Sequence, residues 1–132
     1  MSGRTVEFDD VEPNRSQLPQ ADVVLMGPGG PHGAGWGALA IMDTGADISQ
    51  LPSEAAAGVG IEVGIGPTVV LATAGGLVHR HRVRVDILIQ GVDLTVDVDF
   101  APGVRPLIGR STMFALMDSV GFEPSEWLMK WR

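Results

Sequence analysis

A period of two in the apolar residues dominates the middle of the chain. From Leu77 to Ile89, and again from Val92 to Phe100, mostly apolar positions alternate with charged or hydroxyl-bearing ones. Successive side chains of a strand point to opposite faces, so this period predicts two long strands, each buried on one face. The segment Gln90-Gly91 between them is a turn signal. The other face is expected to lie in solvent, and it carries Arg80, Arg82, Arg84, Asp86, Asp93, Asp97 and Asp99.

Shorter apolar runs predict further strands at residues 23–26, 38–42 and 67–72. Residues 73–76 have the sequence Thr-Ala-Gly-Gly, which is typical of a tight turn. The run at 67–72 and the long strand that begins at Leu77 are therefore predicted to form a hairpin.

Other segments interrupt the strand pattern. Six of the eleven residues from 27 to 37 are glycine, and we predict an irregular loop there. Residues 51–60 are compatible with a short helical turn. The hydroxyl of Ser111 can accept a free N–H of a first helical turn, which predicts a helix from there to about Asp118. The whole pattern predicts a mostly β, closed, barrel-like structure with one short C-terminal helix.

Composition narrows the class of protein. A length of 132 residues suggests one domain, which we place at residues 21–132, preceded by a polar N-terminal arm at residues 1–20 that has one short strand near Thr5. The chain has no cysteine, which excludes disulfides, thiolate zinc sites and cysteine nucleophiles. A net charge of −7 disfavours nucleic acid as a partner. We see neither a signal peptide nor the run of about 20 apolar residues that a membrane helix needs, so no membrane partner and a cytoplasmic location are expected.

The segment from Ala38 to Asp47 carries the candidate chemistry. An apolar strand runs directly into Asp43-Thr44-Gly45, which places a carboxylate at the end of a strand and a sharp turn beneath it. A surface turn is the alternative, because such a triplet occurs by chance in roughly one chain of this length in twenty. The context favours a site: Ala46-Asp47 follows, and an apolar-apolar-Gly-Arg element, residues 107–110, lies about sixty residues downstream.

These segments resemble those of the retropepsin-like aspartic proteases. Residues 43–47 are similar to the active-site signature of that family, and residues 106–110 resemble the element that supports its active-site loop. The resemblance covers about residues 22–120. It implies that Asp43 is catalytic, that Thr44 joins the active-site loops of two subunits, and that Asp47 and Arg110 pair to brace the loop. It further implies loop support by Gly45, Ala46 and Gly109, and a flap whose tip is Ala74, Gly75 and Gly76.

The family mechanism needs two aspartates, and this chain has one motif, because Asp118-Ser119 is followed by Val120 and not by glycine. The resemblance therefore implies a homodimer that hydrolyses extended polypeptides by activating water between two Asp43 carboxylates, with no metal or organic cofactor. Trp127, Met129 and Trp131 fall on one face and either join the dimer interface or pack on their own core. The alternative function is a non-catalytic peptide-binding or assembly module on the same fold.

Three further features qualify this interpretation. His79 and His81 share a strand face, but no third ligand converges on them, so packing or rim roles are favoured over metal binding. The glycines of residues 27–37 do not match a phosphate-binding loop. Ala46 offers no hydroxyl to the catalytic carboxylate, and we therefore expect activity to extend toward neutral pH.

Overall fold

Strands make up most of the described chain. The computed structural model describes residues 5–7, 9–10, 19–29, 33–64, 68–123 and 128–131. Its helices are α1 (Ser53–Val59) and α2 (Arg110–Ser119). Its strands are β1 (Thr5–Glu7), β2 (Asp9–Asp10), β3 (Pro19–Met26), β4 (Gly35–Met42), β5 (Ser49–Pro52), β6 (Thr68–Thr73), β7 (Gly76–Ile89), β8 (Val92–Ala101), β9 (Leu107–Ile108), β10 (Val120–Glu123) and β11 (Leu128–Trp131).

Within the described residues, six strands close into a barrel in the order β3-β4-β9-β5-β8-β7. The barrel closes because β3 pairs with β4 along one edge and with the end of β7 along the other. Its interior is filled by the inward positions of the long strands, among them Val23, Leu25, Ile87, Val98 and Phe100. The predicted mostly β, closed fold with one short C-terminal helix is confirmed, and α1 occupies the segment where a helical turn was expected.

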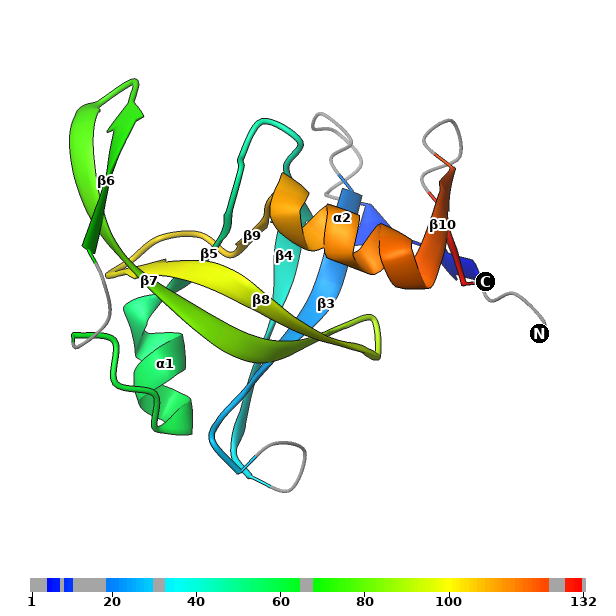
Figure 1. The fold of residues 1–132 in the computed structure, drawn as a ribbon, viewed down its shortest axis with the longest axis horizontal. Helices are drawn as coiled ribbons and strands as arrows, with labels where there is room; N and C mark the ends of the chain where they lie inside the picture. The colour runs from blue at the N-terminus through cyan, green and yellow to red at the C-terminus, as the bar shows by residue number, and fades with distance from the viewer. Residues whose placement is uncertain are drawn as a thin grey trace.

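The hairpin of β6 and β7 projects from the barrel, at the upper left of Figure 1. The two helices cover different parts of the barrel. Helix α1 contacts β3, β4, β5 and β8, and its buried side chains are Ala55, Ala56 and Val59. Helix α2 packs on β8 and β5 and buries Met113 and Leu116. No helix in the described part of the chain is both long and apolar enough to cross a bilayer.

The glycine-rich segment is more regular than its composition suggests. Gly35 and Gly37 belong to β4 and pair with Met26 and Val24 of β3, so the prediction of an irregular loop up to residue 37 is wrong from Gly35 onward. The neighbouring strand supplies the backbone partners, and a Cβ atom at Gly35 would lie 3.2 Å from Cγ1 of Val24. The Val24 side chain of β3 thus lies close to the position that a side chain at Gly35 would take.

The two ends of the chain meet in a separate small sheet of order β1-β11-β10 (Figure 1). β1 pairs antiparallel with β11, and the adjacent β2 pairs with β3 of the large sheet, so strands form in the segment predicted as a polar arm. Trp127 lies outside the described residues, and for Met129 and Trp131 only the backbone is described. The predicted interface role of these three residues therefore stays a prediction.

Candidate active site

The Asp43 loop lies where β9 enters the sheet between β4 and β5. β9 runs parallel to β4 and antiparallel to β5, so it separates two strands that are consecutive in the chain. The connection between them, residues 43–48, must therefore cross over the end of β9. The Asp43 N–H donates to the Ile108 carbonyl at 2.9 Å, which ties the first residue of the loop to β9. In the view of Figure 1 this loop rises between the β6–β7 hairpin and α2.

The backbone of the loop orients the Asp43 carboxylate. The Gly45 N–H donates to Oδ1 of Asp43 at 2.8 Å, and the Ala46 N–H donates to the Asp43 carbonyl at 3.2 Å. A Cβ at Gly45 would lie 3.1 Å from that same Oδ1, so glycine is the residue that allows this close approach. The carboxylate is thus held in one orientation in a half-buried position, with Thr44 exposed beside it.

The N-terminus of α2 supports the loop from below. The Arg110 and Ser111 N–H groups donate to the carbonyls of Ala46 and Asp47 at 2.8 and 3.0 Å. The prediction that Ser111 caps the helix is wrong: α2 begins at Arg110, and the loop carbonyls occupy free N–H groups of its first turn. Arg110 Nη2 also forms an ion pair with Oδ1 of Asp47. These side chains are 48% and 79% exposed, so the pair contributes little stability and the backbone bonds dominate.

Two buried hydroxyls complete the support, and sequence reasoning missed both. Ser49 Oγ lies 2.6 Å from Thr112 Oγ1 and accepts the Gly109 N–H at 2.9 Å. This small network joins β5, β9 and α2 directly beneath the loop. Its only signal in the sequence is the presence of hydroxyl side chains in otherwise apolar surroundings, which is too common to identify a site.

Gly109 permits the closest approach in this network. A Cβ at this position would lie 2.6 Å from the backbone carbon of Ile48, so the loop or the helix would have to shift. We expect Gly109→Ala to lower the free energy of unfolding by about 3 kcal/mol, because overpacking against backbone cannot relax by side-chain rotation. Chemical denaturation measures this change.

The matched control for this substitution is Gly64→Ala, since no atom lies within 4 Å of a Cβ built at Gly64. Its stability should stay the same or rise by up to about 1 kcal/mol, because alanine restricts the unfolded chain. Equal stability of the two variants would contradict the close contact between Gly109 and Ile48.

A groove separates the Asp43 loop from the β6–β7 hairpin. It has a volume of about 570 Å³ and is lined on one side by residues 45–48 and on the other by residues 70–73 of β6. The predicted flap tip, Ala74, Gly75 and Gly76, is the exposed turn of this hairpin and does not itself line the groove. Thr73 Oγ1 fixes the turn by accepting the Gly75 N–H and donating to the Gly76 carbonyl.

The far wall of the groove carries a charged pair that was expected to lie in solvent. Asp99 is only 2% exposed, so its assignment to a solvated face is wrong. Arg82, directly across the ladder on β7, binds it through two hydrogen bonds, and both residues line the groove. Alternation predicts the face of a strand but not what covers that face.

An apolar depression lies on the other side of the Asp43 loop. It has a volume of about 300 Å³ and is lined by Thr44, Arg110, Met113, Phe114 and Met117. Phe114 is 61% exposed and Met117 41% exposed, and large apolar side chains this exposed are few among the described residues. This surface, the α2 patch, is continuous with the loop that carries Asp43.

The structure thus brings together Asp43, Thr44, Gly45, Ala46, Asp47, Gly109 and Arg110. His79 and His81 lie on β7, outside this loop, and His81 Nδ1 lies 3.5 Å from Thr68 Oγ1 of β6. Among the described residues, no group of three His, Cys, Asp or Glu side chains is placed to hold a metal ion.

A family model described as aspartyl protease matches residues 35–112, which span β4 to the start of α2 and so include the whole Asp43 loop and its support. A search of curated proteins finds no significant match.

Proposed function

Because the chain belongs to the aspartyl protease family, we propose that it is an aspartic endopeptidase that acts as a homodimer, with Asp43 as the catalytic carboxylate. The observation that carries this proposal is the Asp43 loop itself. A carboxylate stands at the end of a strand and is fixed by the Gly45 N–H, and residues 45–48 of the same loop line a groove of about 570 Å³. The same surface on a protein that only bound peptides would not require a fixed carboxylate.

The reaction would use a water molecule between two carboxylates. One ionised carboxylate takes a proton from the water, and the other, protonated, donates one to the carbonyl oxygen of the scissile bond. Two carboxylates in contact cannot both be ionised, as is well known for aspartic proteases, so the pair supplies both forms at once. The Gly45 N–H would hold each carboxylate in place while these protons move.

The second carboxylate would come from a second copy of the chain. Two-fold symmetry places identical surfaces against each other, so Asp43 of both copies can meet on the axis. The α2 patch supports this arrangement, because it exposes apolar side chains directly beside Thr44, where the axis would pass. Burial of this patch against its symmetry mate would remove it from water.

The substrate would bind as an added strand. β6 is the last strand in its sheet order, so its outer edge has no strand partner within the described residues. Four consecutive residues of β6, 70–73, line the groove. An extended polypeptide can pair with such an edge.

The test is cleavage of unfolded casein between about pH 3 and about pH 7, combined with sedimentation of the same sample. We expect a dimer and internal cleavage that persists above about pH 4, because Ala46 offers no hydroxyl to the carboxylate. Cleavage confined below about pH 4 would contradict the expected pH range but not the assignment as a protease. A strict monomer without cleavage would contradict the proposal and favour a peptide-binding module.

A further inference from the structure

The charged pair in the groove leaves part of the Arg82 guanidinium unused. Nε and Nη2 of Arg82 donate to Oδ1 and Oδ2 of Asp99 at 2.7 and 3.0 Å. These bonds use the edge of the guanidinium that carries the Nε–H and one N–H of Nη2. Within the described residues no other acceptor binds Arg82, so both N–H groups of Nη1 and the second one of Nη2 remain available. This free end is a two-pronged donor of the shape that a carboxylate matches.

The pair also holds Arg82 rigidly and keeps it charged. The Asp99 side chain is 3% exposed, while that of Arg82 is 30% exposed, so the anion is enclosed and the cation reaches the surface of the groove. The hydrogen bonds that Arg82 donates to Asp99 raise the pKa of its guanidinium above the ordinary value. A donor that is already oriented loses little freedom when it binds a ligand.

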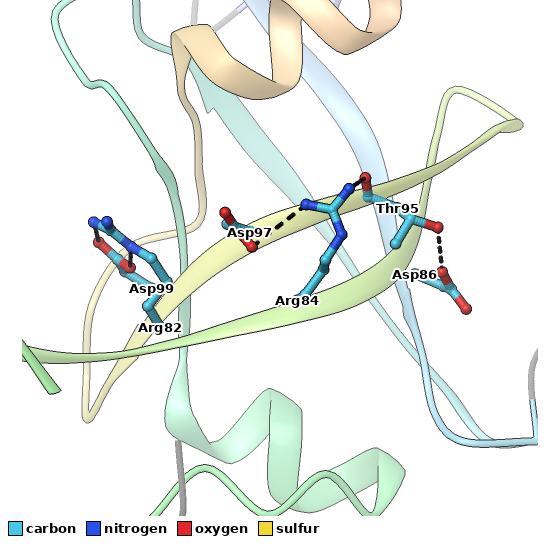
Figure 2. Close-up of polar contacts among 6 residues, drawn as sticks. All are labelled: Arg82, Arg84, Asp86, Thr95, Asp97 and Asp99. Carbon is cyan, nitrogen blue, oxygen red and sulfur yellow. Dashed lines mark hydrogen bonds and ion pairs between the residues drawn. The ribbon is translucent and has the colours of Figure 1, made fainter. Parts of the chain in front are cut away.

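The neighbouring pair on the same strands shows what an ordinary surface pair looks like here. Figure 2 shows Arg84 beside Asp97 and the Thr95 carbonyl, one step along the ladder from Arg82. Arg84 lies 3.6 Å from Asp97, and the two side chains are 65% and 43% exposed. Arg84 lies outside the groove that borders the Asp43 loop. Burial and groove contact therefore distinguish Arg82 from an arginine of the same ladder.

The remaining charge in the groove is balanced. Asp47 faces the same groove but is paired with Arg110, so it does not cancel the donor at Arg82. Ile48, Val70 and Leu71 also line the groove and would contact an aliphatic stem.

We propose that Arg82 forms a subsite for an acidic substrate side chain, so that the enzyme prefers peptides with glutamate or aspartate near the cleaved bond. The free end of the guanidinium would bind the carboxylate, and the apolar groove residues would contact its stem. This inference rests on the proposed function. In a two-fold symmetric dimer the subsite occurs twice, so the preference would appear at one position on each side of the bond.

The experiment is a cleavage-site profile of a random synthetic peptide library, followed by kinetics on three peptides that carry Glu, Gln or Leu at the selected position. We expect kcat/KM to be about tenfold higher for Glu than for Leu, as charge-assisted hydrogen bonds allow, with Gln between them. Arg82→Lys keeps a cation beside Asp99 but lacks the planar fork, and it should lose most of the preference.

Two further variants control the result. Arg84→Lys makes the same change outside the groove and should keep the wild-type profile. The double variant Arg82→Met with Asp99→Leu removes the pair without leaving a buried charge, and it should cleave without acidic preference. Thermal unfolding confirms that each variant folds.

The outcomes separate this inference from the proposed function. Cleavage without acidic preference, or a preference unchanged in Arg82→Lys, would overturn the subsite while leaving proteolysis intact. If nothing is cleaved, binding of the same three peptides is measured by fluorescence anisotropy, and tighter binding of the Glu peptide that depends on Arg82 would support the subsite while overturning proteolysis. If the peptides are neither cleaved nor bound, both the subsite and the proposed function are overturned.

Discussion

Replacing Asp43 with asparagine is expected to lower kcat by at least about a thousandfold while leaving the fold unchanged. Asparagine has the same shape, and its side-chain oxygen can still accept the Gly45 N–H, so the loop should keep its conformation. The amide cannot take a proton from water or carry one to the substrate. The measurement is casein cleavage by wild type and variant, purified in parallel.

The control is Asp86→Asn, which makes the same chemical change on β7. Asp86 is exposed and accepts a hydrogen bond from Thr95 at 2.6 Å, which an amide oxygen can also accept. Full activity of this control and none in Asp43→Asn would assign the catalysis to the loop. Equal cleavage by wild type and Asp43→Asn would mean that another group or another protein cleaves casein.

A charge on the α2 patch is expected to dissociate the proposed homodimer and abolish its proposed proteolytic activity. Phe114→Asp removes an exposed aromatic ring from each of the two facing surfaces, and symmetry brings the two new carboxylates close together. Loss of apolar burial in both copies should raise the dimer dissociation constant by about 100-fold or more. Sedimentation velocity over a concentration series measures the shift, and activity should fall with the dimer fraction.

Leu39→Asp is the matched control for this prediction, since Leu39 is also an exposed apolar residue, at 48%, but lies on β4 and outside the α2 patch. It should remain dimeric and active. A Phe114→Asp protein that associates as tightly as wild type would show that the copies meet through another surface, such as the sheet formed by the chain ends.

Local patterns in the sequence predicted much of the fold. Alternation from Leu77 to Phe100 gave β7 and β8 and their turn, because a strand with one buried face imposes a period of two. The tight-turn sequence at residues 73–76 likewise gave the β6–β7 hairpin. The pairing of β3 with β7, which closes the barrel, joins residues sixty or more positions apart and leaves no local pattern.

The candidate site was predicted in the same uneven way. The Asp43 loop and residues 107–110 were identified because their residue types resemble a known signature, and the structure places them in contact. The burial of Asp99 and the Ser49–Thr112 contact were not predicted. Both depend on a side chain that another element supplies, Arg82 of β7 for Asp99 and Thr112 of α2 for Ser49.

The central claim is that each active site needs one Asp43 from each of two chains. Co-refolding wild type with Asp43→Asn protein in varied proportions tests it most directly. If the copies associate at random, an equal mixture has about a quarter of its dimers with two Asp43 residues, so activity per wild-type chain should fall to about half, and further as the variant increases. Activity per wild-type chain that stays constant at every proportion would contradict the claim, because each chain would then be acting alone.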